Sequence, residues 1–457
     1  MLALAALLLI LLGLYVSLGR YYVPMIQGSR SDIVQYIEKK TGIDIDVTGI
    51  KGEWRRFYPF ITLDQLVVRA PDKKTTPLYF TQIKFAPDVL RSLLNRNLIV
   101  REMQVYGLKV RFEQLDDGSW QLRKLPTRDS KVPFNIDRFV NWVYQIGVLA
   151  VDDAEIELAF ADGSIHEFKH VAVNLENRLG FRRLTIEIDP HAKTSSLTLI
   201  AEGHGDFRSP IKFEGNAWLK LRRFAVPQLQ GTLRAQSIKL NAGEMSGETW
   251  LEFSGVNGIS AITTLSAPLI RWHYDDNSEY QIEQVELPLR AQYHYDGKLQ
   301  VYSPQLQPGS AIAPLWRNAI LLWDTRKKNI TLRSQAVDTK AIVAALAFDP
   351  HLLPEKLRTT LLDLSPEGQL QNLELAVPLD RDSWIQQARL RANLADVSTR
   401  PWHGAPGVSG VAGFIEAHAM DGYIDLASDK FALNFPNLFP APIAVTKALG
   451  RVGWQIT

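Results

Sequence analysis

Apolar and polar residues alternate one by one through most of this chain, which is the pattern of β-strands that bury one face. Ile156, Leu158 and Phe160 alternate with Glu157 and Ala159. The same alternation recurs at Ile43/Ile45/Val47, Ile61/Leu63, Val171/Val173/Leu175, Leu184/Ile186/Ile188, Ile211/Phe213, Leu251/Phe253, Leu287/Leu289, Leu299/Val301 and Leu373/Leu375/Val377. Turn sequences such as Asp162-Gly163 and Asp296-Gly297 separate the runs, so the sequence predicts an antiparallel meander.

Helical patterns are few beside these strands. They cover residues 87–94, 137–146, 339–348 and 354–364. A long sheet with one apolar face needs cover from helices, from a second sheet or from a ligand, and the helices here are too scarce. The residues alone leave two alternatives open, a closed sandwich and an open trough. No Gly/Ser-rich or Pro-rich linker divides the chain, which favours one continuous sheet over residues 43–457.

The N-terminus predicts a membrane anchor. Met1 to Gly19 contains no charged side chain and is long enough to cross a bilayer. A cleaved signal peptide is the main rival, but no Lys or Arg precedes the apolar run. We therefore expect a transmembrane helix over residues 1–22. Ser29 to Asp32 resembles a capping box, and the apolar stripe that follows predicts an amphipathic juxtamembrane helix within residues 23–42.

Aromatic and basic residues gather near this anchor. Tyr21 and Tyr22 end the apolar run, and Trp54, Arg55 and Arg56 follow in the first predicted strands. Trp and Tyr settle at the membrane interface, and Arg attracts anionic lipid. These five residues are the predicted membrane interface, although an ordinary strand edge and turn explains the second group equally well.

Composition excludes several other classes of partner and site. Lys and Arg together number 51 and Asp and Glu 49, so no basic excess is present to neutralise nucleic-acid phosphates. The chain has 0 Cys, which excludes thiolate chemistry, disulfides and Cys-ligated zinc. No cofactor is predicted.

One short segment matches a catalytic motif formally. His166, Glu167 and His170 fit H-E-x-x-H, the zinc-protease signature, which requires a helix. The surrounding alternation predicts a strand instead, on which the two histidines lie about 13 Å apart and cannot share one metal. Their parity also predicts that both lie on the polar face. A zinc hydrolase therefore remains only a remote alternative.

Several segments resemble the AsmA-like family, and within it the YhdP type. They are residues 41–47 (TGIDIDV), 52–54 (GEW), 59–68 (PFITLDQLVV), 364–373 (LSPEGQLQNL) and 406–413 (PGVSGVAG). Each motif is weak by itself, but their order spans nearly the whole chain. Proteins of this type run far longer, so the resemblance implies an N-terminal portion.

The resemblance implies a non-enzymatic, bridge-like lipid transfer protein of the Gram-negative envelope. Its fold would be mainly β, with a transmembrane helix followed by a taco-like groove whose strands run perpendicular to its length. It would be anchored in the inner membrane with its bulk in the periplasm, and would move phospholipid toward the outer membrane, with possible outer-membrane or periplasmic partner proteins. A β-rich scaffold that assists outer-membrane assembly is the alternative.

The predicted groove lining is the apolar set of the alternating strands. Its members are Ile43, Ile45, Val47, Ile61, Leu63, Ile156, Leu158, Phe160, Val171, Val173, Leu175, Ile186, Ile188, Ile211, Phe213, Leu251 and Phe253.

Overall fold

The computed structural model describes residues 2–455, apart from 33, 36–43, 70–77, 97–98, 116–119, 123–140, 142, 162, 179, 190–194, 207–208, 227–237, 275, 277, 307–315, 350, 352, 380–386 and 419–420. The chain forms two compact units. Unit 1 holds Met1–Gly205 and Gly215–Arg222, and unit 2 holds Asp206–Glu214 and most of the chain from Arg223 to Thr457.

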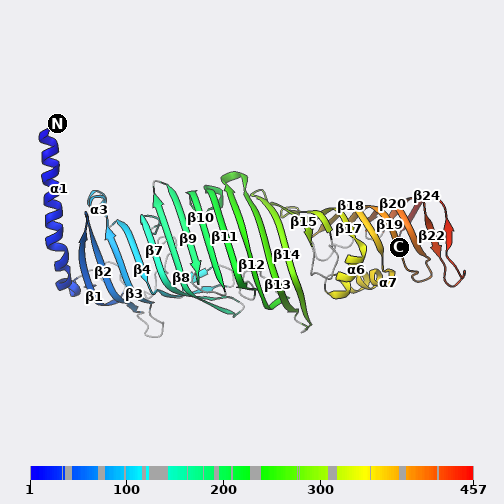
Figure 1. The fold of residues 1–457 in the computed structure, drawn as a ribbon, viewed down its shortest axis with the longest axis horizontal. Helices are drawn as coiled ribbons and strands as arrows, with labels where there is room; N and C mark the ends of the chain where they lie inside the picture. The colour runs from blue at the N-terminus through cyan, green and yellow to red at the C-terminus, as the bar shows by residue number, and fades with distance from the viewer. Residues whose placement is uncertain are drawn as a thin grey trace. The chain divides into compact units, whose positions relative to one another are not determined.

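Both units are built mainly of β-strands, which confirms the predicted mainly-β class (Figure 1). Unit 1 begins with α1 (Leu2–Tyr22) and the 3₁₀ helix η1 (Val23–Ser29) and contains one further short helix, α3 (Val89–Asn95). Its strands are β1 (Asp44–Arg55), β2 (Tyr58–Arg69), β3 (Leu78–Pro87), β4 (Val100–Tyr106), β5 (Lys109–Gln114), β6 (Trp120–Leu122), β7 (Val148–Ala159), β8 (Ile165–Arg178), β9 (Phe181–Ile188) and β10 (Ser196–Gly205). Strand β11 (Phe213–Ala225) has residues in both units.

The strands of unit 1 pair largely in sequence order. β1, β2, β3 and β4 form one antiparallel series, and β7, β8, β9 and β10 form another. The two series meet at β7, which runs parallel to both β4 and β5. The sheet is therefore mixed, and the purely antiparallel prediction is wrong at this point. A parallel pair needs a crossover of a dozen residues or more, and residues 123–147 between β6 and β7 are long enough.

Unit 2 is a longer meander. Its strands are β12 (Ile238–Ser254), β13 (Ile259–Tyr274), β14 (Glu279–His294), β15 (Lys298–Leu306), β16 (Trp316–Asp324), β17 (Asn329–Asp338), β18 (Glu367–Pro378), β19 (Arg389–Thr399), β20 (Gly407–His418), β21 (Asp421–Ser428), β22 (Phe431–Asn434), β23 (Ile443–Val445) and β24 (Ala448–Gln455). Each strand from β12 to β20 pairs antiparallel with the next. β20 then pairs with both β21 and β22, along different parts of its length.

Three of the predicted helices are confirmed. They are α3, α6 (Thr339–Phe348) and α7 (Glu355–Leu364). Asp88 and Asp338 cap α3 and α6 by accepting hydrogen bonds from backbone amides of the first turn. α6 and α7 lie between β17 and β18 in the sequence, yet β17 pairs directly with β18. Half of the helix predicted at 137–146 lies outside the described residues; in the other half, Asn141 and Val143 are helical. Unit 2 also contains the short 3₁₀ helices η2 (Pro210–Lys212) and η4 (Gly255–Asn257).

The juxtamembrane segment differs in part from its prediction. Residues Val23–Ser29 form a 3₁₀ helix, and residues 30–32 and 34–35 are helical. Pro24 lies near the start of η1 and lacks an amide hydrogen, so the α-helix ends before it. Residues 36–42 lie outside the described part. The predicted boundaries 1–22, 23–42 and 43–457 remain predictions.

Candidate functional site

One face of the unit 1 sheet carries an uninterrupted apolar row. Residues that pair across neighbouring strands point to the same face, so the register identifies the row directly. Its members are Ile50, Leu63, Ile83, Val105, Val151, Val173, Ile186 and Leu199, one from each of β1, β2, β3, β4, β7, β8, β9 and β10. We call the face that carries this row the apolar face of unit 1.

The cover over this face changes along the row. Ile50, Leu63, Ile83 and Val105 are 5–8% exposed and belong to one packed cluster. Their counterparts on β7 to β10 are only half-buried. The apolar face is therefore enclosed by protein beside the N-terminal helix and partly open farther along the sheet.

The enclosing protein at β1 is the N-terminal segment itself, which runs alongside β1 (Figure 1). The ring of Tyr15 on α1 packs edge-on against Trp54, with 5.2 Å between the ring centroids. Gly19 lies so close to the Trp54 ring that a Cβ there would be 2.2 Å from it. Farther down, the Val23 carbonyl lies against Gly52, and Ile26 packs on the buried cluster. Glycine is required at both positions because the approach leaves no room for a side chain.

Unit 2 carries a second apolar row, and this one is partly open along its whole length. Its members are Leu251, Ala261, Ala291, Val301, Leu321, Leu332, Leu375, Leu390 and Ala417, one from each strand from β12 to β20. Every one of them is half-buried and none is buried. An aliphatic row of this length inside a closed sandwich would be mostly buried, since interiors are close-packed.

Helix α6 covers one patch beside this row. Ile342 of α6 packs against the cluster formed by Val337, Leu373 and Ala392, which are 4%, 6% and 1% exposed. Leu373 and the half-buried Leu375 lie two residues apart on the same face of β18, opposite Ser334 and Leu332 of β17. The helix therefore decides which part of the apolar face is core and which part is open.

The residue that follows α6, the buried Asp349, is held by the half-buried Tyr274. The Tyr274 hydroxyl at the end of β13 donates a 2.8 Å hydrogen bond to the buried Asp349 carboxylate, and the His351 ring stacks on Tyr274. Burial, helped by this carboxylate, raises the pKa of Tyr274 to about 12.

High pH is expected to weaken this contact. The folded-state pKa of Tyr274 is raised from 10.0 to about 12, so its contribution to stability is complete below pH 10 and is lost as the pH rises through about 12. Urea unfolding at pH values across this window should show a decline in unfolding free energy that is smaller in Tyr274→Phe. An equal decline in both proteins would contradict the assignment.

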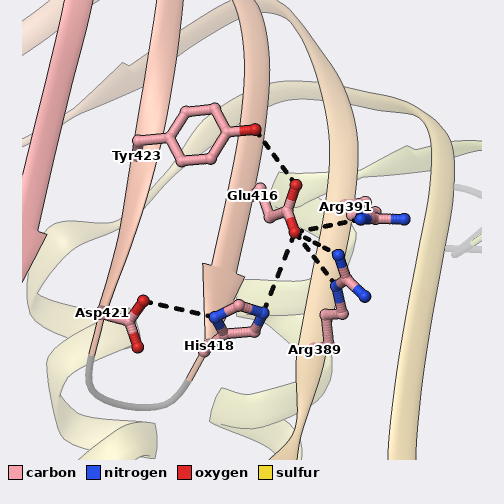
Figure 2. Close-up of polar contacts among 6 residues, drawn as sticks. All are labelled: Arg389, Arg391, Glu416, His418, Asp421 and Tyr423. Carbon is pink, nitrogen blue, oxygen red and sulfur yellow. Dashed lines mark hydrogen bonds and ion pairs between the residues drawn. The ribbon is translucent and has the colours of Figure 1, made fainter.

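The opposite face of the sheet is polar and carries ion pairs between strands. In unit 1, Asp64 accepts hydrogen bonds from Gln82 and Lys51, which lower the pKa of its carboxyl group. In unit 2, Arg389 and Arg391 form ion pairs with the Glu416 carboxylate. The Tyr423 hydroxyl donates a hydrogen bond to the same carboxylate, and His418 lies nearby (Figure 2). Such pairs hold neighbouring strands in register and keep the outer face hydrated.

Most of the predicted groove residues lie on the apolar faces, and a few do not. On the apolar faces lie Ile45, Val47, Ile61, Leu63, Ile156, Leu158, Phe160, Val171, Val173, Leu175, Ile186, Ile188, Leu251 and Phe253. Phe213 is 2% exposed and packs on Phe253. Ile211 lies in η2 rather than on a strand and is 51% exposed, because the alternation begins one residue after that helix. Ile43 lies outside the described residues.

The predicted interface residues lie in two places, at the end of α1 and around the end of β1. Tyr21 and Tyr22 end α1 and are 62% and 60% exposed. Trp54 faces α1, Arg55 pairs with Glu53, and Arg56 occupies the β1–β2 turn with φ 55°.

The predicted groove lining extends only to Phe253 and so omits most of the unit 2 row. The signal was present in the alternations Leu299/Val301 and Leu373/Leu375. What the sequence lacks is the register that joins these short runs into one row.

The H-E-x-x-H segment lies on β8, as predicted, but its parity prediction is wrong. His166 pairs with Leu158 on the apolar face, and its ring contacts Phe160. A β-bulge at His170, with φ 50°, shifts the alternation between these positions. His170 instead hydrogen-bonds Asp153 on β7. Within the described ranges no group of three or more His, Asp or Glu side chains is placed to hold a metal.

The double change His166→Ala/His170→Ala is expected to leave metal content unchanged and to alter thermal stability little. The His166 ring contacts Phe160 whereas His170 pairs with Asp153, and this exposed ion pair contributes at most about 1 kcal/mol of stability. Elemental analysis and a thermal melt of the purified chain test this. Stoichiometric zinc that disappears in the double variant would contradict it.

Comparison with known proteins agrees with the resemblance noted in the sequence. The family model described as YhdP protein matches residues 1–457. The Escherichia coli (strain K12) protein named intermembrane phospholipid transporter YhdP is 22% identical over 486 residues, covering 98% of this chain and 35% of that protein. The chain thus spans about a third of the length of this relative. No solved structure matches the chain. Because the family model matches the chain from its first residue to its last, the chain belongs to the YhdP family.

Proposed function

We propose that this chain binds phospholipid acyl chains along its apolar sheet faces, as part of the movement of phospholipid between the inner and outer membranes. The bulk of the chain would lie in the periplasm, tethered by α1. The proposal is non-enzymatic, and no residue is given a catalytic role.

The observation that carries the proposal is the half-buried aliphatic row of unit 2. An apolar surface left in water is unfavourable by about 25 cal/mol per Å². A row that runs unbroken from β12 to β20 with every member only half-buried therefore favours an apolar ligand. Acyl chains suit such a row because each buried CH₂ contributes about 0.8 kcal/mol without any directional contact.

The length of the row favours sliding over a fixed pocket. Eight steps between strands of about 4.8 Å carry the row roughly 38 Å. The acyl chains of one leaflet occupy about half of a ~30 Å hydrocarbon core. A lipid on this row would find similar aliphatic contacts at successive positions, so its movement along the row would meet small barriers.

The relative supports the identity of the ligand. The E. coli protein is named an intermembrane phospholipid transporter, and it aligns with 98% of this chain. The apolar helix of this chain agrees with an inner-membrane anchor, since Leu9–Gly28 is long and apolar enough to cross a bilayer.

Photo-crosslinking tests the proposal directly. A photoreactive residue at Val301 or Leu332 on the open row should capture phospholipid in cells, identified by mass spectrometry of the adduct. The matched control is Thr331, which neighbours Leu332 on β17 but points to the opposite face. Equal lipid capture at Thr331 and Leu332, or none at either row position, would contradict the proposal.

The scaffold alternative makes the opposite prediction. A β-rich protein that only assists outer-membrane assembly would yield protein adducts at Val301 and Leu332, and purified chain would carry no phospholipid.

A further inference from the structure

The short helix α3 turns a polar residue toward the protein and its leucines toward the outside, which is the reverse of an ordinary surface helix. Its one serine, Ser92, points toward the protein and exchanges hydrogen bonds with the backbone of Ile99. Its leucines point away from the protein: Leu90, Leu93 and Leu94 are 69%, 72% and 84% exposed. These positions follow the i, i+3, i+4 spacing of one helix face. A helix that places three leucines outward in this way presents an exposed apolar face, a feature typical of surfaces that contact a membrane or another molecule.

The position of α3 in unit 1 indicates what lies against its leucines. α3 joins the end of β3 to the start of β4, at the same rim of the sheet as the β1–β2 turn. Arg101 of β4 lies 4.1 Å above the ring of Tyr58, the first residue of β2. The adjoining residue, Phe57, is 49% exposed and accepts a 3.0 Å hydrogen bond from the Tyr15 hydroxyl of α1. Figure 1 shows α3 at this rim, level with the middle of α1.

The contact with Tyr15 shows where along α1 this rim of the sheet lies. Tyr15 lies seven residues before Tyr22, the end of α1, which corresponds to about 10 Å along the helix axis. When α1 crosses the bilayer, the β1–β2 turn and α3 therefore lie deeper in the membrane than the last turn of α1. Helices that lie in the membrane interface bury their apolar face about 5–10 Å into the headgroup and acyl boundary. Counted from Tyr22, the last residue of α1, the two depths agree; counted from Gly28, the last residue of the apolar span, the rim lies deeper still.

Basic residues flank the leucines at the same rim. Arg56 occupies the β1–β2 turn, and Arg91 and Arg96 lie on α3 and at its C-terminal end. Lys and Arg side chains near an anionic leaflet are attracted to it, and Arg91 also pairs with Asp88 at 3.7 Å.

We propose that α3, with the Arg56–Phe57 turn, inserts into the phospholipid leaflet beside α1, so that the rim of the unit 1 sheet is seated in the membrane by two separate elements. The partner is the lipid surface itself. Its consequence for transport rests on the proposed function: a seated rim would let lipid reach the apolar face without passing through water. The insertion itself does not depend on lipid carriage, and its depth can be measured separately.

Membrane depth at single residues tests the insertion. The chain has 0 Cys, so Leu93→Cys can be labelled with an environment-sensitive fluorophore without removing any native residue. The labelled full chain is reconstituted in vesicles of phosphatidylethanolamine and phosphatidylglycerol that contain a bromine-labelled lipid. The control is Ile165→Cys, an apolar position 54% exposed at the opposite end of the strands of unit 1.

The expected result is blue-shifted emission at position 93 that brominated lipid quenches several-fold more than emission at position 165. Adding Leu90→Ser and Leu94→Ser should bring the quenching at position 93 down toward that at position 165. Thermal melting should stay unchanged because both leucines are exposed. Water-like emission at position 93 would overturn the proposal. Blue-shifted emission without quenching would also overturn it, because it would place a protein rather than lipid against α3.

Discussion

A carboxylate in place of Leu375 is expected to remove lipid from the open row of unit 2 while the unit stays folded. Leu375 is half-buried, so the new carboxylate can keep part of its water when no lipid is bound. A lipid that passes must displace that water, with a penalty of at least about 2 kcal/mol, or roughly 30-fold in occupancy. The measurement is lipid crosslinked at Leu332, the cross-strand neighbour, together with a thermal melt.

Leu373→Asp is the matched control, two residues earlier on the same face of the same strand. Leu373 is 6% exposed and packed beneath Ile342 of α6, so a carboxylate there has no access to water. An enclosed charge removes several kcal/mol from a domain stability of about 5–15 kcal/mol, and loss of folded protein is expected. If Leu375→Asp unfolds the unit as Leu373→Asp does, the row is ordinary core and the scaffold alternative is favoured.

Deletion of Met1 to Tyr22 is expected to release the chain from membranes almost completely. Among the residues that the structure describes, only the N-terminal span is a helix long and apolar enough to cross a bilayer. The leucines of α3 bury far less apolar area than a crossing helix, so they support peripheral contact only. The fraction of chain that stays in carbonate-washed membranes measures this.

The intact chain is the control for that deletion, and it should resist the wash. Retention of the shortened chain after carbonate would show that a second segment crosses the bilayer. A chain that is released but also unfolded would instead point to the contacts of Trp54 and Gly52 with the N-terminal segment.

Local pattern predicted the elements well because strand and helix periodicities are properties of short segments. The alternation at Ile156 and Leu158 predicted β7, and α6 begins and ends at its predicted residues, Thr339 and Phe348. The errors occur where a strand leaves its regular period. The bulge at His170 reverses the alternation within β8 and turns His166 to the apolar face.

The parity change at the bulges was visible in the sequence. In β7 the apolar residues are odd-numbered at Leu149 and Val151 and even-numbered at Ile156 and Leu158, with Asp152 and Asp153 between them. A switch of parity around two polar residues is the expected trace of one extra residue in a strand. The parallel pairing of β7 with β4 has no comparable signal in the sequence, because the pairing depends on the path of the chain between the two strands.

By itself, the sequence determined the mainly-β class, the apolar N-terminal helix and which residues of each strand form an apolar set, because these follow from side-chain periodicity within a segment. Only the tertiary structure decided which apolar residues are covered. Leu373 and Leu375 share a strand, a face and a residue type, yet one is core and the other is open. The difference comes from α6, which folds back over β17 and β18 and ends its cover between the two positions. Burial depends on what packs against a face from elsewhere in the chain, and periodicity carries no record of that.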